Sequence, residues 1–260
     1  MIEARNIFES DTSQRSILII SEIENYSSIS DELDRSRALA GVINTFINEY
    51  IEIQISVDKA KGGESIVCPK ALEVALDYQV SQFLPIAITE LRKSQPTADE
   101  LMQSSKNIYE MSGAVKLSFA NRATRNLSTT MGLLWERLAN VSPYAINPEL
   151  EFGIKIKGID LIAKNRTTNH IEYQQLKTQH NTLTGSQKGR SVSELLIHEN
   201  PVFCACFANN SSWTFSHPDI PRVSGRDFWE RIGISYDIVL KCLKNLIAQL
   251  EKEYVKLLNG

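Results

Sequence analysis

The stretch from Phe152 to Gln187 constrains the fold of this chain more than any other. Its alternating apolar and polar residues predict two strands that are joined by a turn over 165–169 and followed by a polar loop. If the hairpin is symmetric about that turn, the numbers of paired residues sum to about 335 and Asp160 lies opposite Gln175. Lys177 then shares their face, so an acid, an amide oxygen and an amine are expected to converge.

The composition is that of a soluble globular protein. The chain has 260 residues, of which 42% are hydrophobic, and this is enough for a packed core. No apolar run approaches the roughly 20 residues that span a bilayer, and the polar, acidic beginning is unlike a signal peptide. We therefore expect a cytoplasmic protein with no membrane partner. The four cysteines are too few and too scattered for a disulfide framework or a zinc site.

Positive charge is concentrated in one part of an otherwise acidic chain. The formal net charge is −3, yet residues 155–190 hold seven Lys or Arg against two Asp or Glu, a local balance of +5. A focused basic surface on an acidic body suits a polyanion such as nucleic acid. The alternative interpretation is a charged hairpin that is merely exposed to solvent.

The first part of the chain is predicted to be mainly helical. Apolar residues at helical spacing predict one long helix from Ser30, a second from Pro69 that is kinked or broken at Pro85, and a third from Thr97 to Met111. Residues 1–30 fit either a strand or a helix. We expect a region over 1–115 that serves dimerisation or embraces DNA, with ordinary core packing as the alternative.

The second part of the chain combines helices and strands, so the expected class is α/β. A Ser128-Thr129-Thr130 cluster is expected to cap a helix that carries Glu136, which either is solvated or lies over the hairpin. An apolar strand is predicted at 201–207, then a short helix that buries Phe228 and Trp229, and a final helix from Ser235 that packs within the chain.

The order of these residues resembles a known enzyme core. A helix with Glu136, a strand with Asp160 and a strand with Gln175-Leu176-Lys177 resemble the PD-(D/E)xK nucleases, and more closely the type II restriction endonucleases. The resemblance covers 116–260 and implies a catalytic domain with a mixed central sheet flanked by helices. A later segment, RVSGRDFW, is similar to one that several restriction enzymes carry. Two departures are Gly158-Ile159, where a proline usually precedes the aspartate, and Gln175, where an acid is usual.

The resemblance implies Mg²⁺-dependent hydrolysis of double-stranded DNA. Asp160, Gln175 and the Leu176 carbonyl would hold one or two ions, and Lys177 would stand beside the attacking water. Glu136 would orient the lysine or bind a metal, and could replace the charge that Gln175 lacks. Glu172 lies on the opposite face and could do so only across a bulge.

DNA contacts and a partner subunit are also implied. Cutting both strands of a short palindrome requires two active sites, so a homodimer is expected. The alternatives are a repair or recombination nuclease on the same core, or a DNA-binding module whose Gln175 marks a lost active site. The recognition sequence and the cut position do not follow from the sequence. The candidate DNA-binding residues are Arg122, Arg125, His180, Asn181, Thr182, Thr184, Ser186, Gln187, Lys188 and Arg190.

Overall fold

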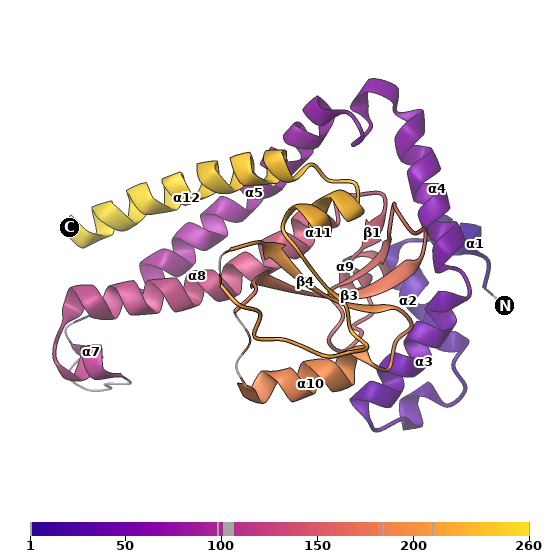
Figure 1. The fold of residues 1–260 in the computed structure, drawn as a ribbon, viewed down its shortest axis with the longest axis horizontal. Coiled ribbons are helices and arrows are strands. Elements are labelled where there is room, and N and C mark those ends of the chain that lie inside the picture. The colour runs from indigo at the N-terminus through magenta and orange to yellow at the C-terminus, as the bar shows by residue number, and fades with distance from the viewer. Residues whose placement is uncertain are drawn as a thin grey trace.

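A mixed β-sheet lies at the centre of the protein, whose structure here is a computed structural model (Figure 1). It describes residues 2–97, 99–100, 107–181, 183, 185–209 and 211–259. Within them the sheet has five strands in the order β1-β2-β3-β4-β5. The pairs β1–β2 and β2–β3 are antiparallel, whereas β3–β4 and β4–β5 are parallel. The strands are β1 (Ala145–Ile146), β2 (Leu161–Lys164), β3 (Ile171–Gln179), β4 (Pro201–Phe207) and β5 (Arg222–Ser224). The expected α/β class with a mixed sheet is confirmed.

The β2–β3 hairpin has the expected register. Leu161 pairs with Gln174 and Lys164 with Ile171, so the paired numbers sum to 335 in both cases. Asn169 closes the turn with φ 58°, a left-handed conformation that asparagine tolerates. Just before β2, the Asp160 N–H donates to the Gln174 carbonyl at 2.9 Å. The symmetric turn thus sets Asp160 beside the middle of β3.

Helices cover both faces of the sheet. The first part of the chain is helical, as expected. Residues 1–30, which fitted either a strand or a helix, contain two α-helices. The expected final helix, the short helix that buries Phe228 and Trp229, and the strand at 201–207 are also present. The helices are α1 (Ala4–Glu9), α2 (Thr12–Ser21), α3 (Glu32–Asn44), α4 (Ile47–Ala60), α5 (Pro69–Lys93), α7 (Ile108–Met111), α8 (Val115–Ala139), α9 (Pro148–Phe152), α10 (Gly185–Leu195), α11 (Arg226–Arg231) and α12 (Tyr236–Asn259).

Strand alternation produces two hydrophobic cores, one on each face. Leu161 and Leu176 pack against α5, α8, α11 and α12, whereas the neighbouring Ile162 and Tyr173 pack against α1 to α4 and α9. Helices from residues 4–93 therefore contribute to both cores. Residue 115, where we expected a boundary between two regions, does not separate two hydrophobic cores.

Two predicted helix boundaries in the first part of the chain were wrong. The helix expected from Ser30 begins at Glu32, capped by Asp31, and is interrupted at Thr45–Phe46 between α3 and α4. Pro85 does not break α5, which runs through it. An internal proline removes one backbone hydrogen bond, and the packing of α5 against α8 and α12 offsets that loss.

The hydroxyl cluster Ser128-Thr129-Thr130, which was expected to cap a helix, does not do so. Ser128, Thr129 and Thr130 lie inside α8, a helix of 25 residues, and each hydroxyl donates to the carbonyl four residues earlier. A serine or threonine satisfied in this way fits a helix interior as well as a cap. The expected cap at Thr97 is present, since its hydroxyl oxygen accepts from the Glu100 N–H at 3.2 Å. Residues 101–106 of the helix predicted after Thr97 lie outside the described residues. The helix α7 follows its own N-cap, Asn107.

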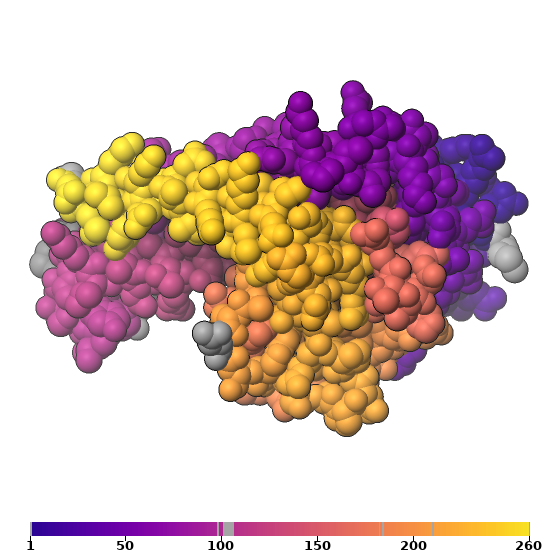
Figure 2. All heavy atoms as spheres, turned by 45° about the horizontal axis from the view of Figure 1, so that its top comes forward, coloured from indigo at the N-terminus to yellow at the C-terminus, as the bar shows by residue number. Residues whose placement is uncertain are grey.

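A helical bundle extends the molecule beyond the sheet. The far ends of α5, α8 and α12 run side by side away from the strands, with α7 next to them (Figure 1). Leu91, Phe119 and Ala123 form a small separate core there with Tyr254. The space-filling view shows a broad recess between this bundle and the orange part of the body (Figure 2). None of the helices in the described ranges is long and apolar enough to cross a membrane.

Candidate active site

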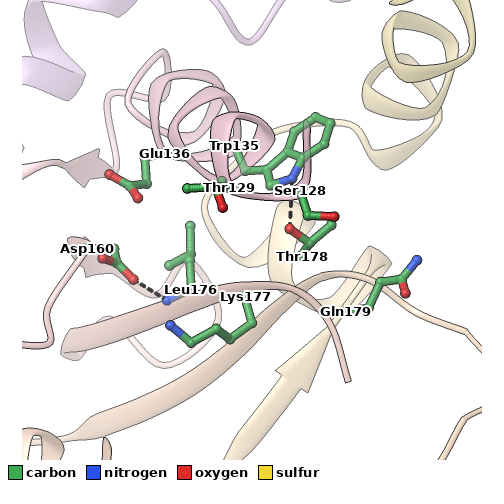
Figure 3. A pocket seen from close by; sticks show the side chains of 10 residues that line it. Ser128, Thr129, Trp135, Glu136, Asp160, Leu176, Lys177, Thr178 and Gln179 are labelled. Carbon is green, nitrogen blue, oxygen red and sulfur yellow. Dashed lines mark hydrogen bonds between the residues drawn. The ribbon is translucent and has the colours of Figure 1, made fainter. Parts of the chain in front are cut away.

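A pocket of about 420 Å³ lies between α8 and the end of the hairpin (Figure 3). It brings together three of the four predicted catalytic residues, Glu136, Asp160 and Lys177. In Figure 3 the Glu136 carboxylate points from α8 towards Asp160, and the Lys177 side chain runs along β3 with its amine directed towards Asp160. The remaining lining residues are Ser128, Thr129, Gly132, Trp135, Leu176, Thr178 and Gln179.

Backbone contacts hold Asp160 in place. Its Oδ2 accepts a hydrogen bond from the Leu176 N–H at 2.6 Å, and its backbone N–H donates to the Gln174 carbonyl. A carboxylate bound to a strand N–H has little freedom to turn away, because losing that bond would leave a partly buried donor unsatisfied. The hairpin register therefore sets both the position and the direction of this carboxylate.

Glu136 reaches the pocket because α8 is fixed to the sheet on its other side. Leu134, Trp135 and Leu138 are buried in the core, and the Trp135 indole N–H donates to the Thr178 hydroxyl at 3.2 Å. Glu136 Oε2 accepts from Asn147 Nδ2 at 3.2 Å. The expectation that Glu136 lies over the hairpin, and is not simply solvated, is confirmed.

The pocket disfavours its own negative charges. Burial, and next the charge of Asp160, raise the pKa of Glu136 to about 7, while Lys177 and Asn147 oppose the shift. Burial also raises the pKa of Asp160, against the effects of Lys177 and the Leu176 N–H. The raised pKa values of both carboxylates indicate that the pocket has too little positive charge to stabilise their ionised forms. A divalent cation would supply that charge and favour the ionised forms.

Gln175 does not line this pocket. Its Nε2 donates to Glu194 Oε2 at 3.4 Å, and its Oε1 is buried with no hydrogen-bond partner among the described residues. Its expected role as a direct metal ligand beside Asp160 therefore has no support in the pocket lining. Glu172 faces the other way, as expected, and its carboxylate accepts from Arg231 and Asn165.

Sequence reasoning missed Glu194 of α10. This carboxylate is 4% exposed, pairs with Arg190 at 2.7 Å, and lies near enough to Asp160 to raise the pKa of that residue. In the sequence Glu194 looks like an ordinary surface acid four residues after an arginine. Only the approach of α10 to the hairpin shows that Glu194 lies next to Gln175 and near Asp160.

Gly158 makes that approach possible. It has φ +73°, and a Cβ added to it would lie 2.5 Å from the Glu194 Cβ. Glycine is the one residue that adopts this backbone conformation easily and leaves the space empty. The glycine at position 158 thus has a local physical reason.

The donor set fits a hard divalent cation. Among the residues that the structure describes, no group of three or more His, Cys, Asp or Glu is arranged to hold a metal by itself. The pocket offers oxygen donors, from Asp160 and Glu136, with Glu194 nearby. Mg²⁺ is commonly bound by one or two carboxylates together with water and substrate phosphate, whereas zinc prefers nitrogen and sulfur ligands. The residues present fit Mg²⁺ as part of a complex with a phosphate.

The two arginines proposed to contact DNA lie on α8 but do not line the pocket. Arg122 pairs with Glu100 and Glu110 at 2.8 Å each, and these partners raise its pKa, Glu110 first. It precedes Glu136 by 14 residues, about 21 Å along a helix. Arg125 is exposed and borders the same ion-pair cluster. The cluster stabilises the bundle, and Arg122 is already neutralised within it.

The end of the expected polar loop after β3 is helical. Ser186, Gln187, Lys188 and Arg190 lie in α10, which begins at Gly185. Polar residues without an apolar stripe gave no helical signal there. Asn181 is exposed, whereas His180 is buried and stacks on Trp213 with ring centroids 4.2 Å apart. Thr182 and Thr184 are outside the described residues.

Comparison with known proteins adds no relative. Neither the models of protein families nor the curated proteins gave a match to this chain. The pocket and its charges are therefore the basis for assigning a function.

Proposed function

We propose that this protein is a Mg²⁺-dependent endonuclease of the type II restriction kind, which hydrolyses phosphodiester bonds in double-stranded DNA. The observation that carries the proposal is the convergence of the Glu136 and Asp160 carboxylates with the Lys177 amine in one pocket at the end of a hairpin. Oxygen ligands for a metal next to a free amine suit the attack of water on a phosphate. The mixed sheet flanked by helices is compatible with the PD-(D/E)xK core.

Each side chain has a role in this proposal. Asp160, Glu136 and the Leu176 carbonyl would hold Mg²⁺, which when bound stabilises negative charge on the phosphate and eases ionisation of the attacking water. Lys177 Nζ orients that water and offsets the charge of the pentavalent phosphate. Glu194 supplies the negative charge that an acid at position 175 would give, and Gln175 holds Glu194 through its amide.

Cleavage of both DNA strands requires two such pockets facing antiparallel strands. We therefore propose that the protein acts as a homodimer with twofold symmetry, matching the symmetry of a short palindromic site. The second candidate function is a DNA-binding module without catalysis. The amide at Gln175, in place of an acid, favours it.

A plasmid cleavage assay with Mg²⁺ tests the proposal. Asp160→Asn, Lys177→Ala and Glu194→Gln should each reduce cleavage by about 10²-fold or more, because each removes charge that acts in the transition state. Lys252→Ala, which changes an exposed lysine of α12, should leave cleavage unchanged.

The pattern of products separates the alternatives. Discrete fragments from the parent protein, abolished by EDTA, support a restriction endonuclease. Nicking that depends on DNA structure and not on sequence would instead favour a repair nuclease. DNA binding without cutting, equal in the parent and the three variants, would exclude the enzyme and leave the binding module.

A further inference from the structure

A second pocket is lined by residues that come shortly before Asp160 in the chain. In Ile154-Lys155-Ile156-Lys157 the isoleucines are 3% and 2% exposed, whereas both lysines are more exposed. The two lysines line a pocket of about 340 Å³ against the start of α3. We call it the lysine pocket; its polar lining consists of Tyr26, Glu32, Arg35, Ser36, Lys155 and Lys157.

The lysine pocket has a net positive charge. Three bases face one acid, Glu32, whose side chain is 68% exposed and pairs with Lys157 at 2.7 Å. Lys157 lowers the pKa of Glu32, and Arg190 and Arg35 act in the same direction. The Ser36 hydroxyl accepts from the Lys157 N–H at 2.9 Å and so fixes the backbone beneath the pocket. Glu32 thus occupies the position that an external anion would take.

The lysine pocket is formed by the segment that leads to Asp160. Lys155 precedes Asp160 by five residues, a separation of at most about 17 Å even in a fully extended chain. Lys157 is followed by Gly158, which closely approaches Glu194, and Glu194 pairs with Arg190. A strand whose scissile phosphate lies at Asp160 would therefore pass this pocket with a neighbouring phosphate.

We propose that the lysine pocket binds a phosphate of the DNA strand next to the scissile phosphate, and that this phosphate displaces Glu32 from Lys157. The proposal rests on the proposed nuclease function. An exposed ion pair is weakly held, so the exchange of one anion for another costs little. Lys155 and Lys157 position the strand and release counterions on binding, and Glu32 opposes binding until it is displaced.

Equilibrium binding of a fluorescent DNA duplex tests this inference in the full chain carrying Asp160→Asn, which keeps a hydrogen-bond acceptor for Leu176 but does not cut. Adding Lys155→Ala should weaken binding about 3- to 10-fold and reduce the slope of log K against log salt by about 0.9, the effect of one phosphate contact. Adding Glu32→Gln should change the affinity in the opposite direction. Binding should tighten about 2- to 5-fold at low salt, because no acid then competes with the phosphate.

Matched controls are Lys252→Ala and Glu251→Gln, which make the same charge changes on exposed positions of α12. Both should leave affinity and salt slope unchanged, and circular dichroism should show every variant folded. If Lys155→Ala and Glu32→Gln behave like these controls while the Asp160→Asn protein binds DNA, the lysine pocket is not a phosphate site although the nuclease proposal stands. If the Asp160→Asn protein binds no duplex, both proposals fail.

Discussion

Two carboxylates share one pocket with a single lysine, and this imbalance is the main chemical feature at the scale of residues. Asp160 raises the cost of ionising Glu136, and Glu194 raises that of Asp160, in surroundings that already disfavour charge. Such an arrangement lowers stability in the free protein, and a metal–phosphate complex relieves it. The pocket is therefore organised for a bound state more than for the stability of the empty protein.

Glu136→Gln should stabilise the protein at pH 8 while abolishing cleavage. The folded pKa of about 7 lies above the ordinary value of 4.5, so the favourable contribution of protonated Glu136 is complete below pH 4.5 and is lost as pH rises through 7. The neutral glutamine avoids that loss, and the gain in unfolding free energy should approach about 2–3 kcal/mol at pH 8 and vanish near pH 4.5. Urea denaturation without Mg²⁺ across this pH range measures it.

The same denaturation series provides a control at an exposed acid. Glu251→Gln should change the unfolding free energy by less than about 0.5 kcal/mol at every pH. With Mg²⁺ and DNA present, the parent protein should gain stability and the Glu136→Gln variant should gain less. A Glu136→Gln variant that is less stable than the parent at pH 8 would show that the carboxylate is not strained in the empty pocket.

At the scale of elements, the close contact between α10 and the segment before β2 brings Glu194 towards Asp160. Only a glycine at 158 permits it, because a side chain there meets both a positive φ and the Glu194 side chain. α10 has a short apolar face, with Ser191, Glu194 and Leu195 as its buried residues. The position of the second acid thus depends on the absence of a side chain at position 158.

Gly158→Ala should destabilise the protein by about 2–4 kcal/mol, through strain at positive φ and through overpacking against Glu194. It should also reduce cleavage, since α10 must move. Gly189→Ala is the matched control, because Gly189 lies in α10 with nothing within 4 Å of an added Cβ. In a helix interior this change should stabilise by about 0.5–1 kcal/mol. Equal effects of the two substitutions in thermal denaturation would contradict the contact.

At the scale of the whole molecule, the sheet is held between layers that come from both halves of the chain. α5 packs with α8 and α12 on one face, and α3 and α4 cover the other. The expected helical region over 1–115 is therefore part of the same structure that positions Glu136 and Asp160. Its proposed roles in dimerisation or in embracing DNA would be additional to that packing.

A fragment of residues 116–260 should not fold cooperatively by itself. It would lack α5 on one sheet face and α1 to α4 on the other. Each large apolar side chain left in water costs about 1.5–3 kcal/mol. We expect little near-ultraviolet circular dichroism and no sharp thermal transition, whereas the full chain should show both. Addition of a separately made 1–115 fragment should restore the signal in part. A fragment that unfolds sharply alone would establish an independent catalytic domain.

The sequence by itself determined the features that depend on neighbouring residues. The turn over 165–169 fixed the hairpin register, and hence placed Asp160 against β3, because strand pairing follows directly from a symmetric turn. The same local patterns predicted the strand at 201–207 and the final helix. Where local signals were compatible with two outcomes, packing decided: α5 runs through Pro85 without a break, and the prediction that the Ser128–Thr130 cluster caps a helix was wrong.

Tertiary structure alone decided which distant residues share the site. α8 brings Glu136 over the hairpin, α10 brings Glu194 beside Gln175, and Arg122 is drawn into an ion-pair cluster away from the pocket. Each of these outcomes depends on how the helices pack, through contacts between residues 12 or more positions apart. The alternation of residues along a strand predicts which face of the sheet a side chain occupies. Which residues of other elements pack against that face is decided only in the folded protein.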